Sequence, residues 1–276
     1  MSTTYDYPSR FESYQFWRKK YGSSSKLEKF TTGKGTLAEY NKLIQHGSCP
    51  ICDDYKIPIN PEDGKRYFCI CSMIEWMHKQ KARIEGLETF AKQEKLSELK
   101  PVGDDKSLIT LKNSLVSFVK NETPQKPWFY IYGEKGSGKT HILMAMKNYF
   151  GPMAFYISSE EFQNHLHRCL SKKSSMDVQE FIEIVATAPI LLFDDLGIEY
   201  KNSEYFIAQL AAVINMRYNR GQERFPLMLT SNIEVSDLIL SPSSDIQRIG
   251  SRLADKEFVQ IHKLSQADYR LMDRAK

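Results

Sequence analysis

The segment that most constrains this chain is a glycine-rich loop, Gly133–Thr140, which reads G-x-x-x-x-G-K-T. The apolar run Trp128–Tyr132 precedes the loop and predicts a buried strand, and His141–Phe150 follows it and predicts a helix. This order is typical of a loop that binds phosphate groups, because backbone N–H groups turn into one concavity at a helix N-terminus. We expect Lys139 to reach the β- and γ-phosphates of a nucleotide, and the Thr140 hydroxyl to help hold Mg²⁺.

The motif predicts a continuous set of nucleotide contacts. They are Gly133, Glu134, Lys135, Gly136, Ser137, Gly138, Lys139 and Thr140. The alternative interpretation is a chance glycine-rich turn before a helix.

Apolar runs alternate with helical patterns along the rest of the chain. The runs that predict further strands are Met153–Ile157, Ile190–Phe193, Leu227–Thr230 and Phe258–Ile261. Apolar strands that alternate with helices indicate a parallel sheet covered on both faces. We therefore expect a three-layer α/β domain over residues 101–276, with residues 1–100 as a small, mainly helical N-terminal domain. The boundary is expected at Pro101–Asp105, where turn-forming residues gather.

Two helices are predicted on either side of this boundary. One is a long helix that begins near Met73 and continues to about Lys100. The other ends at Val119, and its spacing predicts a buried stripe of Leu108, Leu111, Leu115 and Phe118 or Val119.

Polar side chains end two of the predicted strands. Asp194 and Asp195 follow the run Ile190–Phe193, and Asn232 follows Leu227–Thr230. Ligands of open α/β sheets bind at the carboxyl ends of the strands, so these residues should lie near the glycine loop. Asp194 would then complete the Mg²⁺ shell, Asp195 would polarise an attacking water, and Asn232 would position that water. The alternatives are a helix cap or turn at the acidic pair and an Asx turn at Asn232.

Two arginines, Arg248 and Arg252, are four residues apart and would share one face of a helix. An arginine that reaches the γ-phosphate of a neighbouring subunit stabilises the charge of the transition state. From their spacing alone, ordinary surface arginines are the better interpretation.

Four cysteines gather in the segment 47–72, as the pairs Cys49/Cys52 and Cys69/Cys71 with a predicted hairpin between them. Paired thiolates on tight turns supply the ligands of a tetrahedral zinc ion, and four thiolates make such a site structural. The second pair is C-x-C, which is tighter than the usual C-x-x-C. Reduced thiols, packed or exposed, are the alternative.

Four segments in this order resemble AAA+ ATPases of the DnaC/IstB type, a group that includes bacterial and phage helicase loaders and transposase helper ATPases. They are Gly133–Thr140, Leu191–Gly197, Leu229–Asn232 and Arg248–Leu253. The resemblance covers about residues 105–276. It implies an ATPase with ATP and Mg²⁺ as cofactors, in which Asp194 and Asp195 are the Walker B pair and Asn232 is sensor 1. Arg252 or Arg248 would be the arginine finger, acting across the interface of a ring or spiral of identical subunits.

The sequence departs from many AAA+ ATPases in two respects. Asp195 stands where many members carry glutamate, and the shorter side chain predicts slow, switch-like hydrolysis. Only a short segment follows Arg252, so we expect no helical lid domain, which loaders of this group also lack.

The resemblance extends to partners. The cysteine segment 47–72 resembles the zinc-binding N-terminal segment of phage-type loaders, which implies that residues 1–100 dock on a replicative helicase. The helix Glu160–Leu170 and the loop after it correspond to an element that contacts single-stranded DNA. The expected phosphate contacts are Arg168, Lys172 and Lys173, with His165 and His167 beside them and Phe162 available for base stacking.

The leading functional hypothesis is therefore an ATP-dependent loader of a replicative helicase onto single-stranded DNA at replication initiation. The alternatives are an IstB-type transposase helper ATPase and a P-loop small-molecule kinase. The chain has no secretory pattern at its N-terminus and no apolar run near the ~18 residues of a membrane span. We expect a cytoplasmic protein with no membrane partner.

Overall fold

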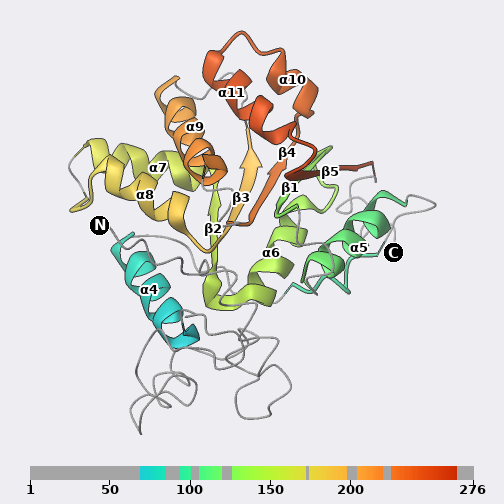
Figure 1. Ribbon diagram of the computed structural model, residues 1–276, viewed down its shortest axis with the longest axis horizontal. Helices are drawn as coiled ribbons and strands as arrows, with labels where there is room; N and C mark the ends of the chain where they lie inside the picture. The colour runs from blue at the N-terminus through green and yellow to red at the C-terminus, as the bar shows by residue number, and fades with distance from the viewer. Residues whose placement is uncertain are drawn as a thin grey trace, which may run out of the picture.

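The computed structural model describes residues 69–84, 94–100, 106–119, 126–171, 174–197, 204–219 and 225–265 (Figure 1). Within these residues, five parallel strands form one sheet in the order β2-β3-β4-β1-β5. The strands are β1 (Trp128–Gly133), β2 (Ala154–Ser158), β3 (Ile190–Leu196), β4 (Leu227–Ser231) and β5 (Val259–Leu264). The predicted parallel sheet is confirmed, with β1 in contact with β4 on one side and β5 on the other.

Helices cover both faces of the sheet, as Figure 1 shows. The described helices are α4 (Ile70–Arg83), α5 (Ser107–Val119), α6 (Lys139–Phe150), the 3₁₀ turn η1 (Gly151–Met153), α7 (Ser159–Leu170), α8 (Val178–Thr187), α9 (Glu204–Asn219), α10 (Val235–Ile239) and α11 (Ser244–Leu253). The three-layer α/β fold expected from the sequence is confirmed for this part of the chain.

The core divides into two clusters, one on each face of the sheet. Along β1, Trp128 and Tyr130 join the cluster built with α7, α8, α9 and α11, whereas Phe129 and Ile131 join the cluster built with α5 and α6. This alternation follows from the two-residue period of a strand. The predicted stripe of α5 is confirmed: its buried residues are Leu108, Leu111, Leu115 and Phe118.

The long helix predicted from Met73 to about Lys100 is wrong. Helix α4 ends at Arg83, Ile84 adopts an extended conformation, and residues 94–100 form a turn. Gly86 follows two residues after Ile84 in the sequence, and glycine at that place is a common signal for the end of a helix. Leu99, near the end of the predicted helix, is instead buried in the core cluster formed with α5 and α6.

Helix α4 packs on the same core as the sheet. Met73 and Met77 are buried in it, and the Lys81 ammonium donates a hydrogen bond to the backbone oxygen of Ala154 at 2.8 Å. Arg83 forms an ion pair with Glu180 of α8. The final part of the predicted N-terminal domain therefore lies against the α/β domain. Residues 1–68, with Cys49 and Cys52, and residues 85–93 lie outside the described residues.

Candidate nucleotide-binding site

The glycine loop joins β1 to α6 and makes the tight turn that a phosphate-binding loop needs. Gly136 and Gly138 have φ angles of 83° and 91°, in the left-handed region that favours glycine. Gly133 is constrained by its neighbour: a Cβ atom there would lie 2.2 Å from the backbone oxygen of Leu264 on β5. The strand–loop–helix context predicted from the sequence is confirmed.

Lys139, the first residue of α6, is buried and folds back over the loop. Its Nζ atom donates to the backbone oxygens of Gly133 at 2.8 Å and Glu134 at 2.7 Å. Carbonyl dipoles at the start of the loop therefore hold the ammonium group. Thr140, next in the chain, is exposed.

Asp194 lies on β3 and is buried, with 4% of the residue exposed. Its carboxylate accepts a hydrogen bond from the Tyr156 hydroxyl at 2.8 Å and another from the Thr230 hydroxyl. Burial and the neighbouring Asp194 raise the pKa of Tyr156, so Tyr156 remains protonated and donates to the carboxylate. Strands β2 and β4 thus hold this carboxylate from both sides.

Asp195 has a different environment from Asp194. It is exposed, and its φ angle of 53° makes it the non-glycine residue with positive φ among the described residues. A register shift between Phe193 and Leu196 accommodates this conformation, which aspartate tolerates better than most residues. Strained backbone of this kind often occurs at functional sites.

The amide of Asn232 meets the carboxylate of Asp195. Asn232 Nδ2 lies 3.3 Å from Asp195 Oδ1, and the backbone N–H of Asp195 donates to the Thr230 hydroxyl at 2.8 Å. Strands β1, β4 and β3 are consecutive in the sheet and end at the same edge. The structure therefore gathers the glycine loop, the acidic pair and the amide at one end of the sheet, as the sequence predicted.

This arrangement has the parts that phosphoryl transfer requires. A loop with a lysine suits phosphate groups, and the carboxylate of Asp194 with the hydroxyl of Thr140 is an oxygen donor set suited to Mg²⁺. Asp195 and Asn232 form a hydrogen-bonded pair that can orient a water molecule. Tyr156 and Thr230, which both donate to Asp194, were not predicted as site residues from the sequence. Their hydroxyl groups in otherwise apolar strands are the signal that could have identified them.

The two candidate finger residues lie on α11 and differ in their surroundings. Arg252 donates to Asn215 Oδ1 at 3.3 Å, and its guanidinium lies 4.4 Å from the ring centre of Tyr218. Arg248 is more exposed and pairs with Asp245 at 2.9 Å, one turn earlier. Figure 1 shows α10 and α11 beyond the end of the sheet at which the strands finish.

The prediction for the DNA-binding helix is partly wrong. Phe162 is fully buried among Phe181, Phe193 and Phe206, so it cannot stack on bases. His165 is also buried, and burial together with Arg168 lowers its pKa. These two side chains lie on the inner face of α7, which a resemblance in position along the chain does not reveal. His167 is exposed and Arg168 is half-buried, whereas Lys172 and Lys173 lie outside the described residues.

The described half of the cysteine cluster lies at the start of α4. Cys69 is its N-cap residue and Cys71 is in its first turn, and both are buried. The predicted tight knuckle at this pair is therefore the beginning of a helix. Cys49 and Cys52 lie outside the described residues, so the zinc site remains a prediction.

Residues 112–235 match a family model described as the bacterial DnaA ATPase domain. The replicative helicase loader DnaI of Bacillus subtilis is 28% identical over 141 residues, which is 49% of this chain and 43% of DnaI. The chromosomal replication initiator protein DnaA of Picosynechococcus sp. is 41% identical over 83 residues, which is 27% of this chain and 18% of that protein. The matched segments therefore span less than half the length of these relatives.

Solved structures show the same fold. A crystal structure of DnaI superimposes with a TM-score of 0.50 and 20% identity, and covers 69% of this chain and 98% of that chain. AMPPCP-bound DnaA from Aquifex aeolicus gives a TM-score of 0.50 and 20% identity, with 68% and 56% covered. Among the described residues, none of the helices combines the length and apolarity needed to cross a membrane. The expected resemblance is confirmed: residues 112–235 are similar to the bacterial DnaA ATPase domain, and part of the chain is similar to the replicative helicase loader DnaI.

Proposed function

We propose that this protein is an ATP-dependent loader of a replicative DNA helicase onto single-stranded DNA. The observation that carries the proposal is the match to the helicase loader DnaI, which extends over 49% of the chain. The matches to the initiator DnaA cover smaller segments, such as the 27% shared with the cyanobacterial protein. An ATPase domain that gathers its polar groups at one end of the sheet is consistent with this role.

ATP hydrolysis would use the residues at the strand ends. Lys139 would exchange its bonds with the carbonyl oxygens of Gly133 and Glu134 for bonds with phosphate oxygens. Mg²⁺, held by Thr140 and Asp194, would neutralise charge that develops on the phosphates. Asp195 would accept the proton of the attacking water, and Asn232 would orient the carboxylate through its 3.3 Å contact.

The ATP site would be completed by a second copy of the chain. Arg252 and Arg248 lie on α11, beyond the strand ends, where a neighbouring subunit could receive a guanidinium. In a mixture of Lys139→Ala and Arg252→Ala subunits, each variant alone would be inactive, but the mixed interface would pair an intact loop with an intact arginine. Recovered ATP turnover on mixing supports a shared site, and the same experiment with Arg248→Ala identifies the finger. ATP turnover that is independent of protein concentration and survives loss of both arginines would favour the kinase alternative.

The N-terminal region would hold the helicase, supported by a structural zinc ion on Cys49, Cys52, Cys69 and Cys71. The positions of Cys69 and Cys71 at the N-terminus of α4 support this set, because thiolates are stabilised near the positive end of a helix. Loss of about one zinc ion per chain in a Cys69→Ser variant, measured by elemental analysis, is the expected result.

Single-stranded DNA would follow the outer side of α7. Arg168, which is half-buried, is on this helix, and Lys172 and Lys173 follow in the sequence. Binding through phosphate contacts weakens steeply with salt, so the double substitution Arg168→Ala and Lys172→Ala should reduce the salt dependence of DNA affinity. An unchanged salt slope contradicts this DNA path.

The proposed function is tested by helicase binding and loading. We expect the full chain to co-elute with its replicative helicase, and to transfer that helicase to single-stranded DNA only with ATP. Lys139→Ala should bind helicase but fail to load it, whereas Asp195→Asn should load it and fail to release it. Lack of co-elution with the helicase in every nucleotide state contradicts the proposal, and co-elution with a transposase instead supports the IstB-type alternative.

A further inference from the structure

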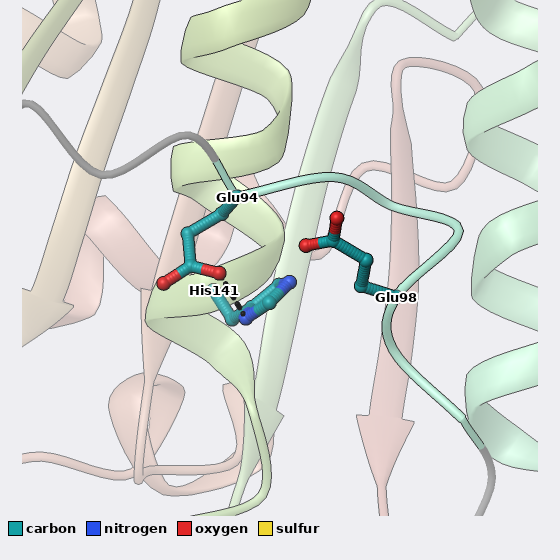
Figure 2. A group of neighbouring side chains, drawn as sticks. All are labelled: Glu94, Glu98 and His141. Carbon is teal, nitrogen blue, oxygen red and sulfur yellow. Dashed lines mark ion pairs between the residues drawn. The ribbon is translucent and has the colours of Figure 1, made fainter.

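A second cluster of ligand side chains lies beside the glycine loop and uses none of the residues assigned to the nucleotide. Glu94 and Glu98, from the segment 94–100, approach His141 on α6 (Figure 2). Their nearest ligand atoms all lie within 4.8 Å of one another. The side chains of Glu94 and His141 are 27% and 25% exposed. Two carboxylates and one imidazole thus converge, with Glu94 and His141 half-buried and Glu98 exposed.

The hydrogen bonds of His141 show which ring nitrogen faces the carboxylates. Nε2 lies 3.2 Å from the backbone oxygen of Lys95, which can only accept, so Nε2 carries a proton and donates. Nδ1 lies 3.0 Å from Oε2 of Glu94. Two lone pairs repel at that distance, so a proton or a metal ion lies between these two atoms. A separation of this size suits two ligands that are each about 2 Å from one ion.

The position of Glu98 favours the metal ion over the proton. A protonated imidazole accounts for the contact with Glu94, but it has no further N–H group for a second carboxylate, because Nε2 donates to Lys95. Lys95 orients Glu98, because its backbone N–H donates to Oε2 at 3.3 Å and its Nζ atom lies 3.8 Å from Oε1. That ion pair is exposed and therefore weak, so it does not compete strongly with a metal ion for the carboxylate. The two peptide groups of Lys95 therefore orient both His141 and Glu98, as the supporting groups of a metal site commonly do.

The segment that carries the two glutamates is anchored at both ends. Asn148 Nδ2 donates to the backbone oxygen of Glu94 at 2.9 Å, and Lys112 Nζ donates to the backbone oxygen of Leu99 at 2.7 Å. The Leu99 side chain is buried in the core. The carboxylates are consequently held near His141 before an ion binds, which lowers the entropic cost of binding.

We propose that Glu94, Glu98 and His141 bind one divalent transition-metal ion, of which zinc is the best match. A nitrogen ligand with two carboxylates suits zinc better than Mg²⁺, which prefers oxygen, and three protein ligands leave a fourth position for water. The ion would link segment 94–100 to α6, the helix that begins at the end of the glycine loop. It would thus stabilise the contact between this segment and that helix. This proposal is independent of helicase loading and of the four-cysteine site.

The test counts zinc ions in full-length protein without nucleotide, dialysed against buffered free Zn²⁺ and measured by elemental analysis. We expect His141→Ala and Glu94→Gln each to bind about one zinc ion fewer per chain than the wild type. The matched control is His167→Ala, which removes an exposed histidine from α7 and should keep the wild-type count. In a Cys49→Ser, Cys52→Ser background, the loss caused by His141→Ala should be the same, because the two sites are separate.

Equal zinc counts in the wild type, His141→Ala and Glu94→Gln would show an imidazolium–carboxylate pair and overturn the proposal. Circular dichroism and a cooperative thermal transition establish that each variant is folded. If His141→Ala does not fold, Glu94→Gln decides, because glutamine keeps the size of glutamate. As a second readout, Zn²⁺ should raise the Tm of the Cys49→Ser, Cys52→Ser background, and His141→Ala should abolish that rise; a rise that persists contradicts the site.

Discussion

Two buried cations, at opposite ends of the sheet, both donate hydrogen bonds to backbone carbonyl oxygens but differ in their surroundings. At the carboxyl ends of the strands, Lys139 binds carbonyl oxygens of its own glycine loop. At the amino ends, Arg217 on α9 is fully buried and donates to the backbone oxygens of Val185, Ala186, Ala188 and Pro226. Both cations compensate carbonyl dipoles, but only Lys139 lies beside exposed acidic and amide groups.

The surroundings explain the difference between these regions. Arg217 is buried between the connection from α8 to β3 and the start of β4. Its hydrogen bonds therefore stabilise the backbone of these two segments. The loop around Lys139 ends in exposed Thr140, and Asp195 nearby is exposed and has a strained backbone. The amino ends of the strands therefore stabilise the fold, whereas the polar groups at the carboxyl ends are accessible to a ligand. Substitutions at the two ends should therefore separate ATP turnover from stability.

The largest expected effect is at Asp195. Asp195→Asn removes the proposed base but keeps the shape and tolerates the left-handed backbone, so ATP turnover should fall about a thousandfold while ATP affinity stays close to that of the wild type. The free energy of unfolding should change little, because the side chain is exposed. Steady-state turnover and nucleotide binding measure the two quantities. Turnover within a fewfold of the wild-type value would place the base elsewhere.

At the opposite end, Arg217→Met should lower the free energy of unfolding by about 3 kcal/mol, because it leaves buried carbonyl oxygens without donors. Turnover per folded molecule at low temperature should remain close to the wild-type value. Urea unfolding measures the loss, and Arg83→Met is the control, since its pair with Glu180 is exposed and worth at most about 1 kcal/mol. An equal effect of the two substitutions would contradict a supporting role for Arg217.

Thr230 connects the two acids and should show a smaller, mixed effect. Thr230→Val removes the hydroxyl that donates to Asp194 and accepts from the Asp195 N–H. We expect a loss of about 1–2 kcal/mol in stability and about a tenfold loss in turnover. Thr187→Val, which removes an exposed hydroxyl that donates to the Glu183 backbone, is the control. If both quantities stay unchanged, Thr230 does not position the acidic pair.

The last prediction concerns the pH dependence of stability that Lys81 causes at the amino end of β2. Burial and the nearby Lys147 lower the pKa of Lys81 from 10.5 to about 7. Between these values the unfolded chain binds a proton that the folded chain does not, so stability rises with pH, by at most about 1.4 kcal/mol per unit.

The stability difference between wild type and Lys81→Met should therefore grow in favour of the wild type from pH 7 toward pH 10, and stay constant below pH 7. Urea unfolding across this range measures the slope. Lys79→Met, which changes an exposed lysine paired with Glu75, should show no comparable slope. A flat difference for Lys81→Met would mean that its ammonium group is not desolvated.

The sequence predicted the parts of this molecule that depend on local patterns. The loop Gly133–Thr140, the acidic pair at the end of β3 and Asn232 at the end of β4 each follow from residues that are close together in the chain. Their meeting follows from the rule that parallel strands finish at one edge.

What the sequence could not predict depends on contacts between distant segments. The position of β1 is set by pairing with β4, 99 residues later in the chain, and with β5, 131 residues later. The inward direction of Phe162 and His165 depends on α8 and α9, which cover that face of α7. The left-handed turn at Asp195 arises from its register shift beside β4, and apolar patterning carries no signal for such an irregularity.

The central claim is that the carboxyl ends of the strands form an ATP-hydrolysing site in which Lys139 exchanges carbonyl oxygens for phosphates. ATP turnover by Lys139→Ala, beside the wild type and the exposed control Lys79→Ala, tests it most directly. We predict that wild type and Lys79→Ala hydrolyse MgATP equally and that Lys139→Ala loses at least about a hundredfold while keeping its Tm. Turnover by Lys139→Ala equal to that of the wild type would contradict the account.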